Sequence, residues 1–387
     1  MSVEKVEKKA LPIWIPLFKD LFVITDPGRD QDDEDVLVML NRMIRLEILQ
    51  VLGVVANLAP SAQRARLAKG TLQLLGQNQV PVGYGSNCLQ SEEDGLEYQF
   101  SVGYLAEHDN VVDGKALIYE TLKNARPKSI VLLLISGLTD AAAVLREHHY
   151  LFQKAVRRVV IMGGVKTCKD NPNAPELDGE GRILPDETAQ NHKFDLEATR
   201  YLYRMLQDME IPITVVSRHA AVAARVPRSV YEEMAQTGHP IGTRLLAAQK
   251  EAIQKVWERA NMAADDPNRL ELPARCDKTW FCNNFLGGKG AELTSQDNIW
   301  DLVQTFNLYD PCTLAACIPN QREHFFSPTV VEVHGVEHLI IGVSAQVHNV
   351  REPLALAEHL RNMLVESLKQ AQVSASPKAQ EATSKVA

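Results

Sequence analysis

The sequence lacks three features that would assign it to common functional classes: a basic excess, closely spaced cysteines and a long apolar run. Its 387 residues carry 41 Lys and Arg against 49 Asp and Glu, a formal net charge of −8, which argues against a nucleic-acid-binding surface. The six cysteines contain no CxxC pair, so free thiols in a reducing compartment are favoured over a zinc site. No apolar run approaches the roughly 20 residues of a membrane helix, and the proline-broken N-terminus is unlike a signal peptide. We therefore expect a cytoplasmic protein that binds neither nucleic acid nor membrane.

The order of the apolar segments predicts an α/β fold. Residues 21–25, 129–136 and 156–164 are almost continuously apolar, and segments of helical period follow them along the chain. Such segments are typical of parallel strands covered by helices on both faces. We predict an open, mostly parallel sheet flanked by helices, with a helical and loop insertion around residues 220–300 that breaks the alternation.

One domain is expected over residues 13–372. Residues 1–12 and 373–387 are small, charged or polar, a composition typical of disordered termini. The sequence contains no internal repeat, so a repeat array is not expected.

The most distinctive segment is FVITDPGRDQDDEDVLVML, residues 22–40. Between the predicted strand and the predicted helix lie six carboxylates: Asp26, Asp30, Asp32, Asp33, Glu34 and Asp35. A favourable interaction with the helix dipole explains the last two but not the four aspartates before them. In open parallel sheets, ligands bind beyond the carboxyl ends of the strands. A carboxylate cluster at that position, without several Lys or Arg nearby, predicts a site for a hard cation.

Seven segments, in order, resemble the inosine-uridine-preferring nucleoside hydrolases. The family signature DxDPGxDDxxAL resembles TDPGRDQDD (25–33), with two extra residues here. The other matches are GVVAN (53–57), VPVGYG (80–85), LLISGLTDAAAVL (133–145), VVIMGG (159–164), NHKFDLEA (191–198) and YDPCTLAA (309–316). Each motif alone is weak, but seven in the family's order are specific. Divergent domains of this family also occur in some effectors of plant-pathogenic bacteria, which this chain resembles.

The resemblance implies calcium-dependent hydrolysis of an N-ribosidic bond in a nucleoside or related riboside. The implied calcium ligands are Asp26, Asp33, Asp310 and the backbone carbonyl of Ser136. Asp26 would also be the general base on a metal-bound water. The implied contacts to the ribose hydroxyls are Asp32, Asn57 and Asn191. Family members are often dimers or tetramers, which leaves a homo-oligomer open for this chain.

Some positions depart from the family pattern. Ile24 replaces the first Asp of the signature, and Ala189 replaces an acidic residue two positions before the ribose-binding Asn. The insertion leaves the register of Asp30, Asp32 and Asp33 open. Tyr309 replaces the histidine that protonates the departing base in many members. A phenol has a pKa near 10, so it is a poor proton donor at neutral pH, although it can hydrogen-bond to a base or stack on it.

Two functional hypotheses remain at this point. In the first, the protein hydrolyses a riboside, and Tyr309 or His219 assists the leaving group. In the second, it binds a ribosyl ligand with calcium and turns over little or none of it. His219 is alternatively a surface residue or a phosphate contact. Trp257, Trp280 and Phe281 lie in the insertion, where they either cover the base or pack in the core.

Overall fold

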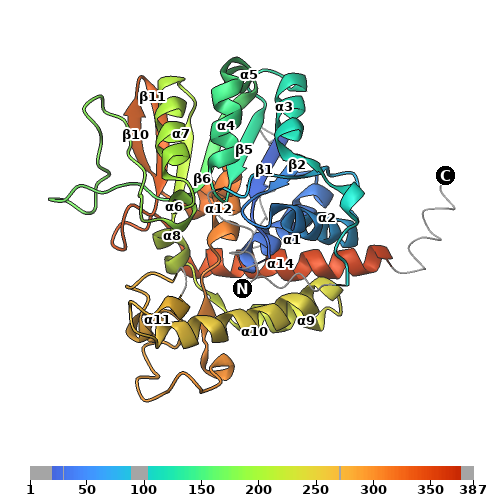
Figure 1. The fold of residues 1–387 in the computed structure, drawn as a ribbon, viewed down its shortest axis with the longest axis vertical. Coiled ribbons are helices and arrows are strands. Elements are labelled where there is room, and N and C mark those ends of the chain that lie inside the picture. Colours follow the sequence, from blue (N-terminus) through green and yellow to red (C-terminus); the bar gives the residue numbers. More distant parts are fainter. Residues whose placement is uncertain (1–19, 29, 89–102, 270–271, 376–387) are drawn as a thin grey trace, which may run out of the picture.

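The computed structural model describes residues 20–28, 30–88, 103–269 and 272–375. Within these ranges the chain forms a nine-stranded sheet with helices on both faces (Figure 1), which confirms the predicted fold class. The predicted disordered N-terminus (1–12) lies outside the described residues, as do residues 376–387 of the predicted tail. The last helix runs to Ala375, three residues beyond the predicted end of the domain at 372.

The strands of the large sheet are β1 (Asp20–Thr25), β2 (Gln50–Ala56), β3 (Val82–Tyr84), β4 (Val112–Asp113), β5 (Ile130–Leu134), β6 (Val156–Gly163), β7 (Ile213–Ser217), β10 (Thr329–Val333) and β11 (Val336–Ile341). The longer helices are α1 (Asp32–Arg45), α2 (Ser61–Leu74), α3 (Gly114–Asn124), α4 (Thr139–Glu147), α7 (Leu196–Asp208), α9 (Ser229–Gln236), α10 (Pro240–Ala260), α11 (Lys278–Phe285), α12 (Tyr309–Cys317) and α14 (Pro353–Ala375). Shorter helices are α5 (His149–Ala155), α6 (Gln190–Lys193), α8 (Arg218–Ala223) and α13 (Pro319–Phe325).

The sheet order is β10-β11-β7-β6-β5-β1-β2-β3-β4. All neighbours pair in parallel except β10 and β11, which form an antiparallel hairpin at one edge. The two residues between them, His334 and Gly335, have φ values of 51° and 79°. Positive φ at both positions suits the tight turns whose twist matches that of paired strands. The predicted parallel sheet therefore carries one antiparallel edge strand.

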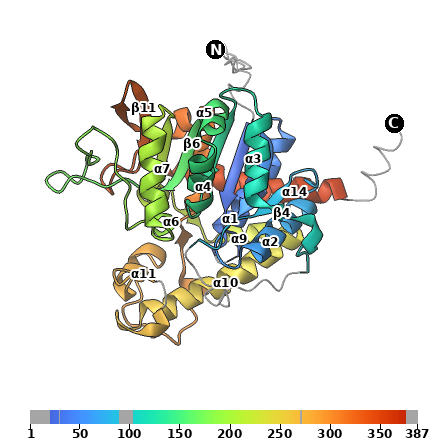
Figure 2. The same cartoon turned by 45° about the horizontal axis from the view of Figure 1, so that its top comes forward.

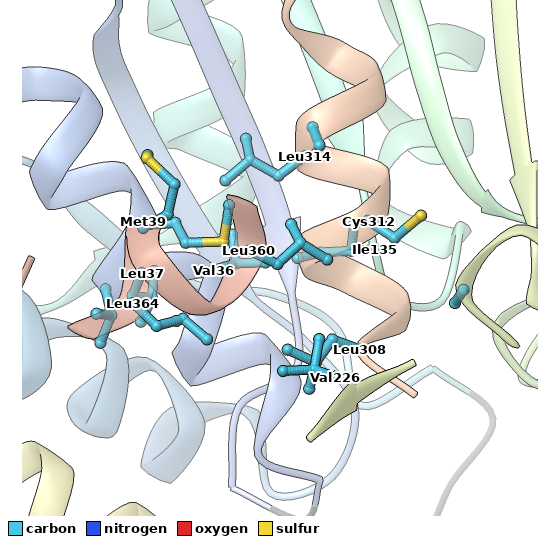
Figure 3. Packing of buried hydrophobic residues seen from close by; sticks show 14 of the residues in the cluster. Val36, Leu37, Met39, Ile135, Val226, Leu308, Cys312, Leu314, Leu360 and Leu364 are labelled. Carbon is cyan, nitrogen blue, oxygen red and sulfur yellow. The ribbon is translucent and has the colours of Figure 1, made fainter. Parts of the chain in front are cut away.

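Two hydrophobic layers cover the sheet. On one face α1, α2, α12 and α14 bury a cluster that includes Leu37, Leu314 and Leu360 (Figure 3). On the other face α3, α4, α5 and α7 bury a second cluster, which includes Phe152 and Leu202. Because both faces are covered, the central strands are buried along almost their whole length, as their continuous apolar sequence predicts.

The predicted insertion is a separate helical layer below the sheet (Figures 1 and 2). It contains α9, α10 and α11, together with a two-stranded sheet of β8 (Val226–Pro227) and β9 (Thr305–Phe306). Trp257 and Phe281 are fully buried in it, with ring centroids 5.0 Å apart. These two aromatics therefore pack in the core, which was one of the two predicted roles.

All six cysteines are free, as predicted from their spacing. Among the described residues, no helix combines the length and the apolar character needed to cross a bilayer.

Candidate active site

The loops after three central strands meet at one edge of the sheet. β1 lies between β2 and β5, in parallel with both. The amide of Asn57 donates to the carbonyl of Thr25 over 3.0 Å, and that of Ile135 donates to the carbonyl of Ile24 over 2.9 Å. These bonds place the acidic segment that follows Thr25 beside the loops that follow β2 and β5. The three loops therefore lie together at the edge of the sheet where the sequence predicts a ligand site.

Three buried carboxylates come together at this edge. Asp32, Asp33 and Asp310 each offer an oxygen, and these atoms lie within 4.8 Å of one another. Gly28 adopts a φ of 127°, a conformation that favours glycine, where the chain turns between β1 and α1. Asp310 comes from the first turn of α12, 277 residues after Asp33 in the sequence. Local sequence and a distant helix thus contribute to one cluster.

Asp32 joins the two helices that carry the cluster. One of its carboxylate oxygens accepts hydrogen bonds from the backbone amides of Tyr309 (3.1 Å) and Asp310 (3.4 Å). These are the first two residues of α12, whose amides have no partner within the helix. No side chain of α12's own flank caps this end. A carboxylate of α1 therefore caps α12 and aligns it with the acidic segment.

Asp33 is held by the last residue of β1 and the residue that follows it. Its carboxylate accepts a hydrogen bond from the hydroxyl of Thr25 and another, of 2.8 Å, from the backbone amide of Asp26. Both donors bind the same oxygen, so hydrogen bonding orients the second oxygen rather than occupying it. The side chain of Asp26 lines the adjoining cavity but is not one of the three that meet within 4.8 Å.

Burial and mutual repulsion raise the pKa of each carboxyl in the cluster. Desolvation, followed by the charge of Asp30, raises the pKa of Asp32 to about 7. The pKa of Asp33 lies well above its ordinary value because of burial and the charges of Asp26 and Asp32. Burial and the charges of Asp32 and Asp33 act in the same way on the pKa of Asp310. Carboxylates packed this closely need a cation nearby to remain ionised.

The donor set fits a hard cation, and its spacing is compatible with calcium. All ligands on offer are oxygens, as a hard cation requires. Ca²⁺–oxygen distances are about 2.3–2.6 Å, so two oxygens on one ion lie at most about 5 Å apart. The carboxylate oxygens of Asp32, Asp33 and Asp310 meet that limit. This set contains Asp33 and Asp310, which the resemblance assigns to calcium, and Asp32, which it assigns to ribose.

Two of the predicted site residues do not line the cavity. The amide nitrogen of Asn57 donates to the carbonyl of Gly137 (2.9 Å) and to Asp140 (2.8 Å), and its oxygen accepts from the hydroxyl of Ser136. Asn57 and Ser136 are fully buried, and neither is a lining residue. Ile135, one position earlier in the same loop, does line the cavity. The ribose and metal roles of Asn57 and Ser136 stay predictions, and Asn57 visibly fixes the loop after β5.

A cavity of about 840 Å³ opens over the carboxylates. Its floor is formed by the acidic segment and the start of α12, and its far wall by the insertion, including Tyr231, Trp280, Phe285 and Phe306. Basic side chains line it on α8, α10 and the loop before α11: Arg218, Arg244, Lys255, Arg259 and Arg275. The cavity therefore has an acidic floor, an aromatic wall and basic groups on α8, α10 and the loop before α11. Its volume suits a small organic ligand.

The last two carboxylates of the acidic segment tie the floor to the wall. Glu34 is fully buried and pairs with Arg244 of α10, and it also accepts hydrogen bonds from Thr71 (2.8 Å) and Tyr104 (2.9 Å). Asp35, also fully buried, accepts a hydrogen bond of 3.1 Å from the hydroxyl of Tyr231. The expected interaction with the helix dipole is thus accompanied by specific buried contacts. These contacts fix the insertion above the carboxylate cluster of Asp32, Asp33 and Asp310.

Tyr309 faces the cavity from the first position of α12. Its phenolic oxygen accepts a hydrogen bond of 3.3 Å from the side-chain amide of Asn307, another lining residue. Burial raises the pKa of Tyr309 to about 12, so the phenol stays protonated at neutral pH. His219 lines the cavity on α8, where burial and Arg218 lower the pKa of its imidazole. Ala189 and Asn191 line it as well, and Asn191 donates to the carbonyl of Met162 over 3.2 Å.

Comparison with known proteins identifies the family. Residues 21–375 match the model of the inosine-uridine preferring nucleoside hydrolases. The chain belongs to this family. The crystal structure of the type III effector protein XopQ complexed with adenosine diphosphate ribose superposes with a TM-score of 0.75 and 30% identity, over 92% of this chain and 95% of that one.

More distant relatives agree on the fold. The inosine-uridine preferring nucleoside hydrolase of Bacillus anthracis has a TM-score of 0.55 at 16% identity, over 91% of this chain and 100% of that one. An uncharacterized protein of Schizosaccharomyces pombe is 28% identical over 153 residues, which are 37% of this chain and 48% of that protein. The match thus spans about half the length of this curated relative. This hydrolase-family chain is similar to the effector over nearly its whole length.

Sequence reasoning missed several contacts of the candidate site, although it had singled out Asp32 and Tyr309 themselves. Asp32 as the cap of α12, the Glu34–Arg244 pair and the Asn307–Tyr309 contact each join segments or side chains that no motif links. One signal was readable: Asn307 lies two positions before Tyr309, so a side chain there lies near the start of the predicted helix. The partners of Glu34 carried no such signal, because Arg244 lies 210 residues away.

Proposed function

We propose that the protein hydrolyses the N-ribosidic bond of a ribonucleoside or related riboside, giving ribose and free base, with calcium as its metal ion. The observation that carries this proposal is the buried cluster of Asp32, Asp33 and Asp310 on the floor of a ligand-sized cavity. Membership of the family gives the reaction type. The acidic floor gives the site at which positive charge on the sugar would be stabilised.

Asp33, Asp310 and Asp32 or Asp26 would hold the calcium ion. When bound, calcium orients hydroxyl groups and lowers the pKa of a water molecule. Asp26 lines the cavity beside the cluster, where its carboxylate accepts the proton of the attacking water. As the bond to the base breaks, the sugar gains oxocarbenium character, and the fixed carboxylates stabilise that charge without reorganising. The aromatic wall excludes water from the base side of the cavity.

A second candidate function is calcium-dependent binding of a ribosyl ligand with little or no turnover. Two observations favour it: a phenol at position 309 is a weak acid, and a relative 30% identical was crystallised with adenosine diphosphate ribose. The basic groups on α8 and α10 would suit the phosphates of such a ligand. Both candidate functions use the same carboxylates at the floor of the cavity, so only a measurement of activity separates them.

An activated substrate tests the proposal most directly. A nitrophenyl riboside has a leaving group that needs no acid, so a competent site would release nitrophenol from it in the presence of calcium. Asp33→Ala, which removes an oxygen of the cluster, would abolish the release, and Asp109→Ala, an exposed carboxylate outside the cavity, would leave it unchanged. Tight retention of the ligand without release by the unaltered protein would instead support the binding function.

A further inference from the structure

A fully buried arginine of α2 holds the backbone of the acidic segment. One terminal nitrogen of Arg64 donates to the carbonyl of Asp26 and, over 3.1 Å, to that of Pro27. Its Nε and its other terminal nitrogen each donate over 3.2 Å to the carbonyl of Ala59. A single guanidinium therefore joins the loop after β1 to the loop after β2.

The position of this arginine has no explanation within its own helix. Arg64 is the fourth residue of α2, in a first turn that holds no acidic side chain. A positive charge near the N-terminus of a helix opposes the helix dipole. A buried guanidinium also loses the water that would solvate its charge. The carbonyls of the two loops replace part of that water, so tertiary contacts account for an arginine at this position.

Asp26 is held at both of its backbone groups. Its amide donates to the carboxylate of Asp33 over 2.8 Å, and its carbonyl accepts from Arg64. Pro27 follows it, and a residue before proline is restricted to extended backbone conformations. The side chain of Asp26 lines the cavity. Arg64 is therefore one of three constraints that set the direction in which this carboxylate points.

Arg64 differs from the basic groups that line the cavity. Five basic side chains do so, and each is at least partly exposed: Arg218, Arg244, Lys255, Arg259 and Arg275. Together with a divalent cation, these groups offset the charge of the aspartates at the floor. Arg64 is buried, is not a lining residue and is bonded to the backbone of the acidic segment. It therefore fixes where Asp26 lies, which charge in the open cavity does not do.

The chemistry of the side chain suits this role. A guanidinium is planar and presents its donors in a fixed fork, whereas the ammonium of a lysine is a point charge on a flexible stem. The donors of Arg64 are divided between two loops. A lysine at this position would keep the charge but would not hold both loops in the same geometry. Arg64→Lys therefore separates the geometry of the contact from its charge.

We infer that Arg64 is a positioning residue for the proposed reaction: it fixes the backbone of Asp26, so that the carboxylate of Asp26 points at the attacking water. This inference rests on the proposed hydrolase function, because Arg64 acts through the base named there. The same bonds help to fix Asp33, whose carboxylate accepts from the amide of Asp26. Loss of the fork should therefore affect both turnover and calcium affinity.

Arg64→Lys tests the inference in the full-length protein, with calcium and a nitrophenyl riboside. Misplacing a reacting group by about 1 Å can cost about 10²-fold in rate, so we expect kcat to fall by about 30- to 100-fold. KM should change little, because the wall of the cavity is untouched. Calcium affinity, measured by calorimetry, should fall by about tenfold, a typical loss when a group that orients a metal ligand is removed.

The kinetic result separates a positioning role from a merely structural one. A structural arginine would lower the free energy of unfolding and leave kcat of the folded protein unchanged. That result, together with release of nitrophenol by the unaltered protein, overturns the inference and leaves the hydrolase function standing. Absence of release by the unaltered protein overturns the hydrolase function and, with it, the role of Arg64 in the reaction.

Arg322→Lys is the matched control. Arg322 donates to the carbonyls of Ala316 (3.1 Å) and Cys317 (3.4 Å) at the C-terminal end of α12, and it does not line the cavity. This variant loses a guanidinium fork, while the floor keeps its own contacts. Its kcat and calcium affinity should equal those of the unaltered protein. Equal losses of kcat in the two variants would show a general loss of packing and would overturn the inference.

Amide hydrogen exchange of the calcium-free, unaltered protein gives a test that needs no variant. The amide of Asp26 is bonded to Asp33, and Arg64 holds the carbonyl of the same residue. This amide should exchange at least about 100-fold more slowly than in an unfolded chain before any calcium is added. Rapid exchange that only calcium suppresses would show that the metal ion, and not Arg64, orders the segment. That result would also overturn the inference.

Discussion

The floor and the wall of the cavity are built in different ways. The floor is made largely from one short segment, with four aspartates between Asp26 and Asp33, and a single distant carboxylate from α12. The wall is made from helices α9, α10 and α11 and the strand β9. These elements are distant from the acidic segment in the sequence, and the three helices form a layer beside the sheet (Figure 2). The floor carries charge that suits a metal ion and a ribose, and the wall carries rings that suit a base.

Their difference teaches how a dense acidic segment can serve two purposes. Asp32 and Asp33 face the cavity, whereas Glu34 and Asp35 are buried against the insertion, where they bind Arg244 and Tyr231. The proposed reaction would thus depend on the first pair, and the position of the wall depends on the second. Variants on each side of this boundary should therefore affect different properties.

The largest effect is expected on the floor. Asp26→Ala should abolish hydrolysis and calcium binding, because it removes the proposed base together with a proposed ligand. The fold should be retained, since repulsion among the remaining carboxylates falls. Calorimetric titration with calcium and release of base measure the two properties. Unchanged calcium affinity in this variant would remove Asp26 from the ligand set and leave it as a base alone.

The link between floor and wall should dominate stability. Glu34→Gln removes the charge of a fully buried side chain and leaves Arg244, whose side chain is 13% exposed, without its partner. Breaking a buried ion pair in this way typically costs about 3–5 kcal/mol of unfolding free energy. Urea denaturation followed by circular dichroism measures the change.

A matched surface pair provides the control for this change. Glu147 pairs with Lys115, and both side chains are about half exposed. Glu147→Gln should change the unfolding free energy far less, because solvent screens the pair. Similar effects of the two variants would show that the buried pair does not fix the wall.

The phenol at the boundary should govern which bases leave. Tyr309→His introduces an imidazole, which titrates near neutral pH and can protonate a departing base. We expect turnover of inosine to rise by at least about tenfold, with little change for the activated nitrophenyl riboside. Steady-state kinetics on both substrates measure the two rates. A loss of ligand affinity without any gain in turnover would instead favour the binding function.

The smallest effect is expected on the wall. Trp280→Ala removes one ring of the aromatic wall, and stacking on a base is typically worth about 1–3 kcal/mol per ring. KM for inosine should rise by about tenfold while calcium affinity stays unchanged. Tyr150→Ala, a ring that is 70% exposed and outside the cavity lining, serves as the control. A change in calcium affinity in Trp280→Ala would show that wall and floor are not separable.

Much of the fold could be predicted from the sequence because buried parallel strands leave a strong local signal. β5 is a continuous apolar segment, β1 is apolar from Leu21 to Ile24 and β6 from Val159 onward, and each of the three predicted segments matches a strand of the sheet. The short β4 and the two-residue strands β8 and β9 left no such signal, since two residues are too few to show a period. The location of the acidic edge followed from the general behaviour of parallel sheets rather than from any single motif.

By itself, the sequence determined the mostly parallel α/β architecture in outline, the acidic segment after the first strand, and the phenol in place of a histidine. Those features are local, because each depends on residues that are neighbours along the chain. Only the tertiary structure decided which carboxylates meet and that Asp32 caps α12. It also decided that the side-chain amide of Asn57 is hydrogen-bonded to other residues of the protein. It also decided that Glu34 and Asp35 hold the wall in place. Such contacts depend on how helices pack across the sheet edge. Glu34 and Arg244 lie 210 positions apart, and no local sequence pattern predicts that they form a buried pair.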